Sequence, residues 1–365
     1  MRTLILSTCG TSLLTNLEPA QRELVYQHAN TRNPDEIPEE ARRRLQMLVA
    51  NTLPEKLREA SPAEQARLSA ELNGILRYYG GHFNARQDIH WLIATDTWLG
   101  EATGKAVGEV LERQGQRVVV KRISDLRTDN LEEFRLGMSE LARLCAQEVK
   151  SMRDSGYRVV FNLTGGFKSV QGFMQALGML YADESIYVFE STSELLRLPR
   201  LPISMNALEL ARKYERIFRR CAAKLSLSHE DTENVPEPLL MSVGDEITLS
   251  PWGDVVWSEA GEAILSEELL PSIDAKLRYD GNFPKTLQNC SKKEIHQVNE
   301  RLGDLARYLN DGTNPNRLDF KKLQASPKGR CTHECDAWAQ GGAKRLFGYY
   351  DEDVFVVVEL AAGLH

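Results

Sequence analysis

The segment from Thr164 to Ser169 reads Thr-Gly-Gly-Phe-Lys-Ser and lies between a predicted strand and a predicted helix. The glycines allow backbone N–H groups to approach a phosphate closely, and Lys168 adds a positive charge beside the start of the helix. The spacing is neither that of a P-loop nor Gly-x-Gly-x-x-Gly. The segment therefore predicts an anion-binding turn, with a tight turn carrying a surface lysine as the structural alternative.

Two further polar segments follow predicted strands. Gly10-Thr11-Ser12 comes after the strand expected at Thr3–Ser7, and Thr95-Asp96-Thr97 comes after the strand expected at Ile89–Ala94. The carboxyl ends of parallel strands meet at one edge of an open α/β sheet, and ligands bind there. We therefore expect three polar loops to converge on one rim, without an acidic cluster for a metal.

Strands and helices alternate through about the first 195 residues, as in proteins with a largely parallel sheet and helices on both faces. The other strands are expected at Arg117–Val120, Tyr157–Leu163 and Ile186–Phe189, and long helical patterns are expected at about 36–78, 98–114, 131–153 and 169–181. This alternation predicts an α/β fold.

The pattern changes after Arg197–Pro202, a segment typical of a boundary linker. A helix is expected at Asn206–Ala223, and then a hairpin of Glu246–Leu249 with Asp254–Trp257 that leads into a helix from Ser258 to about Leu270. These elements predict a small winged-helix-like connector over residues 198–271. A spacer or dimerising role and a DNA-binding role are both open for it.

The last part of the chain places helices before an antiparallel meander, which predicts an α+β module over residues 272–365. The expected elements are a strand at Lys276–Arg278, a helix at Ser291–Asn310, and strands at Thr332–Trp338, Lys344–Tyr349 and Val354–Leu360.

The composition is that of a soluble globular protein. The 365 residues are 42% hydrophobic and 27% charged, which excludes disorder and low-complexity repeats. No apolar run is long enough to span a membrane, and no signal-peptide pattern is found, so a cytoplasmic, non-membrane protein is expected. Six scattered cysteines favour free thiols in a reducing compartment over a disulfide framework.

Charge is distributed unevenly. The formal net charge of −7 argues against a general binder of polyanions. The stretch from residue 317 to residue 330 is nevertheless basic. It contains one acidic residue, Asp319, and five basic residues, which are Arg317, Lys321, Lys322, Lys328 and Arg330. This stretch could direct a phosphate backbone to one place, or it could be an ordinary solvated face.

The segments Leu6–Asn16 and Asn162–Ser169 together resemble the CARF sensor domain of type III CRISPR systems. The resemblance covers residues 1–197 and implies a Rossmann-like domain that forms a two-fold dimer and binds cyclic oligoadenylate, with cyclic tetra-adenylate the expected ring. It implies that the ligand pocket is lined by Gly10, Thr11, Ser12, Thr95, Asp96, Gly165, Gly166 and Lys168. Some CARF domains slowly cleave their ligand, and Ser12 with Lys168 could do so here.

The C-terminal part resembles the RelE-type mRNA interferases. The resemblance rests on Leu277–Tyr279, the helical region Thr286–Asn310, Phe320–Leu323, Lys344–Tyr350 and Val354–Val358. The whole layout is similar to CRISPR-associated, ribosome-dependent interferases with CARF, winged-helix and RelE parts.

Such a domain must let an RNA 2′-hydroxyl attack the neighbouring phosphate, which requires proton transfer and cations for the developing charge. The resemblance implies phosphate stabilisation by Arg345, and no metal or other cofactor. His333 could act as acid or base because histidine titrates near neutrality. Lys328 and Arg330 would hold the message backbone, with Lys344 assisting.

Alternatives remain for these residues. Arg345 could be a surface partner of Glu352 or Asp353, and His333 could be structural. The family's lysine is absent from Thr332–Asp336, and its last catalytic arginine and tyrosine have no match here, so Tyr349, Tyr350 or His365 are candidate substitutes. Cys331, His333 and Cys335 would share one face of a strand, which favours packing over a metal site.

Three functions follow from these patterns. The first is a cyclic-oligoadenylate-activated endoribonuclease that cleaves mRNA in the ribosomal A site, with mRNA, the ribosome and a second copy of the chain as partners. The second is a transcription regulator, for which Ala207–Lys224 carries many arginines and lysines. The third is a ring nuclease with an inert C-terminal module.

Overall fold

The computed structural model describes residues 2–81, 88–189, 194–323, 328–339 and 342–363. The chain divides into two compact units, residues 1–204 and 205–365.

The first unit is built on a six-stranded sheet. Its strands are β1 (Thr3–Thr8), β2 (Ile89–Ala94), β3 (Arg117–Arg122), β4 (Arg158–Asn162), β5 (Glu184–Val188) and β6 (Leu195–Pro199). The order is β3-β2-β1-β4-β5-β6, and every pair is parallel except β5 with β6. The predicted α/β class is therefore confirmed, and the mixed, mainly parallel sheet is compatible with a Rossmann-like domain.

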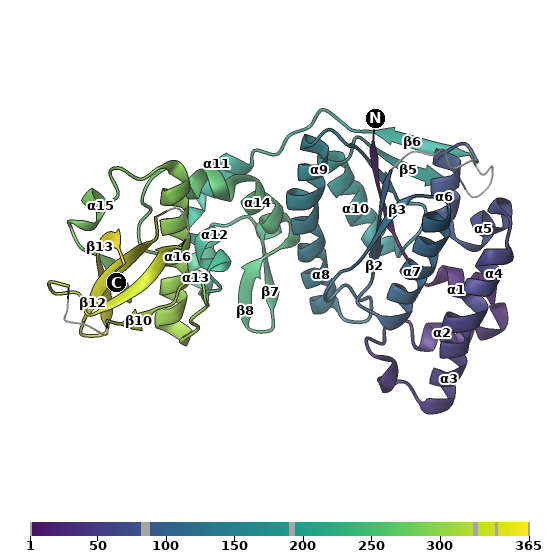
Figure 1. Ribbon diagram of the computed structural model, residues 1–365, viewed down its shortest axis with the longest axis horizontal. Helices are drawn as coiled ribbons and strands as arrows, with labels where there is room; N and C mark the ends of the chain where they lie inside the picture. The colour runs from purple at the N-terminus through teal and green to yellow at the C-terminus, as the bar shows by residue number, and fades with distance from the viewer. Residues whose placement is uncertain (1, 82–87, 190–193, 324–327, 340–341, 364–365) are drawn as a thin grey trace. The chain divides into compact units, whose positions relative to one another are not determined.

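Helices cover both faces of this sheet. Figure 1 shows α6 and α7 on one side of it, and α8, α9 and α10 on the other. The helices of this unit are α1 (Ser12–Leu17), α2 (Arg22–Gln27), α3 (Glu39–Met47), α4 (Leu53–Glu59), α5 (Pro62–Leu68), α6 (Ala70–Tyr78), α7 (Trp98–Arg113), α8 (Leu131–Leu144), α9 (Lys150–Asp154) and α10 (Lys168–Tyr181). The central strand β1 is buried along its whole length, because helices cover both of its faces.

The strand order reverses between β1 and β4. From β1 the chain proceeds outward through β2 and β3, whereas β4, β5 and β6 lie on the other side. In open α/β sheets, such a reversal is the usual position for a ligand, at the carboxyl ends of the two central strands. We call the region between the turns after β1 (residues 9–11) and β4 (residues 163–167) the crevice.

The segment expected to be a linker contains an edge strand. Residues Leu195–Pro199 form β6, which the sequence analysis missed and which crosses the expected boundary between residues 197 and 198. Pro199 ends the strand at the sheet edge, where its missing N–H leaves no ladder bond unmade. The division into three domains stays a prediction.

The second unit begins with α11 (Ala207–Lys213), α12 (Glu215–Ala222) and α13 (His229–Thr232). A hairpin of β7 (Leu240–Val243) and β8 (Glu246–Leu249) follows, and then α14 (Pro251–Leu265). The predicted pairing of Glu246–Leu249 with Asp254–Trp257 is therefore wrong. The hydroxyl of Ser250 accepts a hydrogen bond from the Gly253 N–H at 3.2 Å, and Pro251 occupies the first helical turn, so these residues begin a helix rather than a turn.

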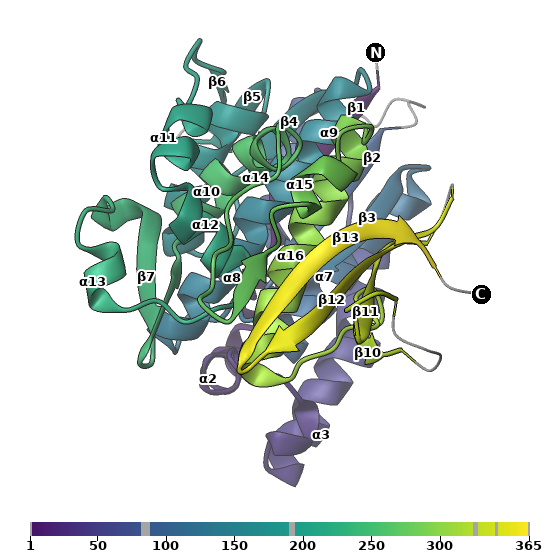
Figure 2. The same ribbon diagram turned by 90° about the vertical axis from the view of Figure 1, so that its left-hand side faces the viewer.

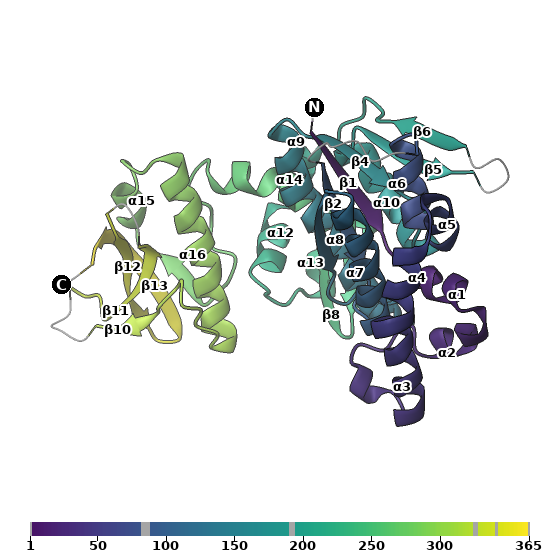
Figure 3. The same ribbon diagram turned by 45° about the vertical axis from the view of Figure 1, so that its right-hand side comes forward.

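The remainder of this unit has a five-stranded sheet in the order β10-β11-β12-β13-β9, seen beside α16 in Figures 2 and 3. Its elements are β9 (Leu277–Tyr279), α15 (Phe283–Thr286), α16 (Lys292–Asp311), β10 (Lys321–Lys322), β11 (His333–Trp338), β12 (Lys344–Asp351) and β13 (Val354–Ala362). The three long strands and the long helix agree with the predicted elements. A capping box between Ser291 and Glu294 begins α16, and Gly312 ends it in the left-handed region at φ 75°.

The start of α14 gives a direct test of the helix that replaces the expected strand. We expect Ser250→Ala to lower the free energy of unfolding by about 1 kcal/mol, the usual cost of losing an N-cap. Ser242→Ala, on an exposed position of β7, should change it by less than about 0.5 kcal/mol. Urea denaturation of both variants checks this, and equal effects would contradict it.

Candidate functional site

The turns after β1 and β4 lie against each other at the crevice between these strands. The Thr8 hydroxyl donates a hydrogen bond to the Gly165 carbonyl at 2.7 Å, and a Cβ atom at Gly10 would lie 3.5 Å from the Gly166 Cα. The side chain of Asn162 donates to the Ser7 hydroxyl at 3.1 Å and to the Glu71 carbonyl at 2.9 Å. Two of the three predicted loops therefore do converge.

Gly166 is required by the shape of its turn. Its φ is 99°, which L side chains rarely adopt, and a Cβ atom there would lie 2.7 Å from the Thr8 hydroxyl oxygen. The next residues lead into α10, whose N-cap residue Phe167 supplies no side-chain hydrogen bond. Lys168 and Ser12 are exposed, whereas Thr11 is buried. The α10 N-terminus and Lys168 are thus available to an anion.

The loop after β2 is occupied by contacts within the protein. Thr95 is buried, with its hydroxyl 2.9 Å from that of Thr97. Asp96 accepts contacts from Arg32 Nε and Arg122 Nε, each at 2.8 Å. Burial raises the pKa of Asp96, but hydrogen bonds from Arg122 and from the Asp125 N–H, with the charge of Arg32, lower it below its usual value. Asp96 therefore organises the loop as an ionised group.

Glu71 was not predicted from the sequence. It lies on α6 at the same crevice and is 1% exposed. Its carboxylate accepts hydrogen bonds from the Gly10 N–H at 3.1 Å and from the Ser69 hydroxyl at 2.7 Å. A Cβ atom at Gly165 would lie 2.5 Å from Glu71 Oε1. In the sequence, the one feature that singles out Glu71 is its position two residues after Ser69, the N-cap of α6. That position predicts the start of a helix rather than a ligand site.

A groove of about 960 Å³ lies on another side of α6. Its lining includes Asn73, Leu76 and Arg77 of α6, with Pro62 and Ala63 at the start of α5. The helix thus carries Glu71 at the crevice, whereas Asn73, Leu76 and Arg77 lie at the groove.

In the second unit, Arg345 on β12 is surrounded by carboxylates. Its guanidinium contacts Glu334, the Asp336 carboxylate at 3.1 Å and the Asp319 carboxylate at 3.6 Å. The expected alternative partners, Glu352 and Asp353, are therefore wrong, because the pairing of β12 with β11 places Asp336 directly opposite Arg345. The Arg345 side chain is 24% exposed, so it is within reach of solvent.

His333 lies within an aromatic cluster. Its ring stacks on Phe320 at a centroid distance of 5.4 Å, and Tyr350 meets it edge-on at 5.1 Å. Its Nδ1 atom lies 2.9 Å from the Thr332 hydroxyl. Partial burial and then the positive charge of Lys322 lower the pKa of His333 below its usual value, which favours the neutral ring.

The other predicted cations of this unit have partners. Lys328 Nζ lies 3.0 Å from the Glu359 carboxylate and 4.1 Å from the Phe347 ring centroid, and Lys344 lies over the Trp338 ring. Arg330 pairs with Asp280 and donates to the Tyr349 hydroxyl at 3.2 Å. Asp304 and Asp319 likewise pair with Arg317 and Lys321. Most of the basic stretch is thus neutralised by acids that lie elsewhere in the sequence.

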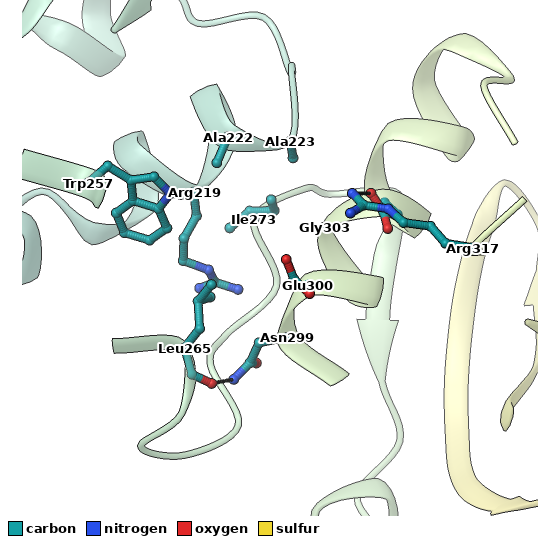
Figure 4. Close-up of a pocket in the computed structure, with 11 residues that line it drawn as sticks. Arg219, Ala222, Ala223, Trp257, Leu265, Ile273, Asn299, Glu300, Gly303 and Arg317 are labelled. Carbon is teal, nitrogen blue, oxygen red and sulfur yellow. Dashed lines mark hydrogen bonds and ion pairs between the residues drawn. The ribbon is translucent and has the colours of Figure 1, made fainter. Parts of the chain in front are cut away.

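The arginines of the connector also make contacts within the unit, which weakens the DNA-binding alternative. Arg219 is buried and reaches Glu215 and the Pro271 carbonyl at 2.8 and 2.9 Å. Arg220 donates to the Ile273 carbonyl at 2.7 Å, and Arg212 pairs with Glu267 at 2.7 Å. Figure 4 shows Arg219 beside a cavity of about 110 Å³, which is small for anything larger than a few waters.

Within the described ranges, no group of three or more His, Cys, Asp or Glu residues is arranged to hold a metal ion. Cys331 and Cys335 are buried, and all six cysteines are free thiols. A search of the described helices finds none with the length and apolarity needed to cross a membrane. His365 lies outside the described residues.

The turn after β4 makes a stability prediction. We expect Gly166→Ala to destabilise the first unit by about 1–3 kcal/mol, because alanine is strained at this φ and its Cβ meets Thr8. Gly172→Ala, on the exposed face of α10 with nothing within 4 Å of the new atom, should stabilise by about 0.5–1 kcal/mol. Denaturant unfolding measures both, and a shared sign would contradict the argument.

A second prediction concerns His333. We expect its pKa, followed by NMR of the imidazole proton, to lie below the usual histidine value. Lys322→Ala should raise it towards that value, since a nearby positive charge disfavours the imidazolium. Lys276→Ala on the same unit serves as the control and should leave the pKa unchanged. An unshifted wild-type pKa would contradict the described environment.

Comparison with known proteins locates one similarity. Residues 66–201 match a family model described as "CRISPR-associated protein (Cas_APE2256)". The match includes β2, the turn after β4 and Lys168, and it begins after β1. No curated protein matches the chain. The first unit is therefore similar, over most of its sheet, to a CRISPR-associated family.

Proposed function

We propose that this protein is an endoribonuclease of type III CRISPR defence that is activated by cyclic oligoadenylate, with cyclic tetra-adenylate as the activator. The observation that carries the proposal is the crevice between β1 and β4, bordered by Gly10, Gly165 and Gly166 with Lys168 at the α10 N-terminus, in a unit similar to a CRISPR-associated family. The ribonuclease part of the proposal is supported by the resemblance of residues 272–365 to RelE-type mRNA interferases.

The crevice suits an anionic ligand. Backbone N–H groups at a helix N-terminus attract phosphate, and Lys168 contributes a full charge at its edge. A cyclic tetranucleotide has repeating phosphates, and a two-fold dimer would present each loop twice to such a ring. We therefore include a homodimer in the proposal, with Ser12 and Lys168 exposed towards the ligand.

The second unit would carry the chemistry. His333, whose lowered pKa favours the neutral ring, can accept the proton of the attacking 2′-hydroxyl, and Arg345 can stabilise the charge that develops on the phosphate. Lys328, Arg330 and Lys344 would hold the message in the ribosomal A site. An RNA phosphate would compete for Arg345 with the carboxylates of Glu334, Asp336 and Asp319. Activation therefore requires that cyclic oligoadenylate bind more tightly to a conformation of the protein in which these carboxylates contact Arg345 less closely.

Ligand binding tests the first part of the proposal. We expect Lys168→Ala to weaken the binding of cyclic tetra-adenylate about 10- to 100-fold, the usual effect of losing one charge-assisted contact. Lys105→Ala on α7, which is exposed and paired with Glu101, should bind as the wild type does. Calorimetric titration measures this, and equal binding by the two variants would contradict the assigned site.

In vitro translation tests the second part. With cyclic tetra-adenylate present, we expect primer extension to detect new cuts on the message, and His333→Asn or Arg345→Ala to slow cutting at least about 100-fold. Arg278→Ala, an exposed residue of β9 that pairs with Asp351, should cut normally. Absence of cutting under any cyclic oligoadenylate would remove the nuclease, and equal cutting of naked RNA would remove the ribosome as a partner.

A further inference from the structure

The carboxylate of Glu71 accepts a hydrogen bond from a backbone N–H of the turn after β1, at the crevice. The Gly10 N–H donates to Glu71 Oε1 at 3.1 Å. Gly165 lies so close to the same oxygen that even a methyl group at Gly165 would come within 2.5 Å of it. An anion that takes the Gly10 N–H must therefore replace this carboxylate, because no space remains for both.

Neutral donors hold Glu71 in place. The Ser69 hydroxyl donates to Oε2 at 2.7 Å, and the Asn162 side chain donates to the Glu71 backbone carbonyl at 2.9 Å. Glu71 also lies in the first turn of α6, where the helix N-terminus favours negative charge. Among the described residues, no lysine or arginine forms an ion pair with it, although its exposure is only 1%. Burial raises the pKa of this carboxyl group despite its hydrogen bonds.

We propose that Glu71 sets the affinity of this crevice for anionic ligands: its carboxyl group occupies the position on the Gly10 amide that a ligand phosphate takes, and it is neutral when the phosphate is bound. This inference rests on the proposed function, because it assumes a phosphate ligand at this crevice. It adds a residue on α6 to a site otherwise made of the turns after β1 and β4.

Electrostatics requires the proton. A phosphate on the Gly10 amide lies beside the displaced carboxyl group. Two neighbouring negative charges in a buried region are unfavourable, so the carboxylate takes up a proton from solvent as the phosphate enters. No bond to the ligand forms or breaks in this step. From the turn after β1 the titratable neighbour is Cys9, a buried thiol whose pKa is raised by its burial and by Glu71. From the turn after β4 the charged residue is Lys168, which is exposed.

The opposing reading is that Glu71 only ties α6 to the turn after β1. Glu71→Gln separates the two readings, because an amide keeps an oxygen for the Gly10 N–H and removes the charge. A purely structural role leaves ligand affinity unchanged in this variant. A role in affinity makes the variant bind more tightly at alkaline pH, where the wild-type carboxylate is ionised.

Calorimetric titration of the full chain with cyclic tetra-adenylate at pH 6, 7 and 8, in buffers of different ionisation enthalpy, tests the inference. We expect wild-type binding to take up a proton and to weaken by up to about tenfold per pH unit above the pKa of Glu71. Glu71→Gln should bind without this uptake or pH dependence. Glu55→Gln, an exposed carboxylate in the first turn of α4, should behave as the wild type does.

The outcomes are distinct. Wild-type binding without proton uptake and without tighter binding by Glu71→Gln would overturn the inference, while a weakened Lys168→Ala variant would keep the proposed ligand. Binding by none of the proteins would overturn both. Should Glu71→Gln fail to fold, proton uptake by the wild type decides alone, since uptake supports the inference and its absence refutes it.

Discussion

A hydrogen-bond network between the ends of β1 and β4 positions the whole candidate ligand site. Thr8 holds the Gly165 carbonyl, and Asn162 joins Ser7 to the backbone of α6. These side chains are buried, so a missing partner would leave a polar group desolvated at a cost of about 1–3 kcal/mol. The same contacts that complete the sheet edge therefore fix the two glycine-containing turns and bring Glu71 against Gly10.

The two units meet the problem of fixed charge in different ways. At the crevice, the Glu71 carboxyl group accepts hydrogen bonds from neutral donors and its pKa is raised, so its protonation state can change. On the C-terminal sheet, Arg345 is balanced by three carboxylates, and Lys328 and Arg330 each have an acidic partner. An anion in either place must displace a carboxylate that belongs to the protein. Competition of this kind makes binding depend on the state of the protein rather than on net charge.

Much of the fold could be predicted from local patterns. The alternation of apolar runs with helical periodicity predicted β1 to β5 and the longer helices between them, because buried strands and amphipathic helices require those residue patterns. The short helices α1 and α2 were not predicted. The hairpin after β8 was predicted wrongly, since Ser250-Pro251 is compatible both with a turn and with the first residues of a helix. The edge strand β6 was not predicted, because its residues show little alternation between buried and exposed positions and because it contains Pro199.

The candidate site, too, was predictable only in its local features. By itself, the sequence determined that glycine-containing turns with Lys168 follow strands of a parallel sheet, since a turn's backbone freedom and a strand's apolar period are local properties. Only the tertiary structure decided which charges meet: Glu71 against Gly10, Asp96 between Arg32 and Arg122, and Arg345 among Glu334, Asp336 and Asp319. These partners are distant in the chain or on paired strands, and charge pairing depends on distance in space, which no local pattern encodes.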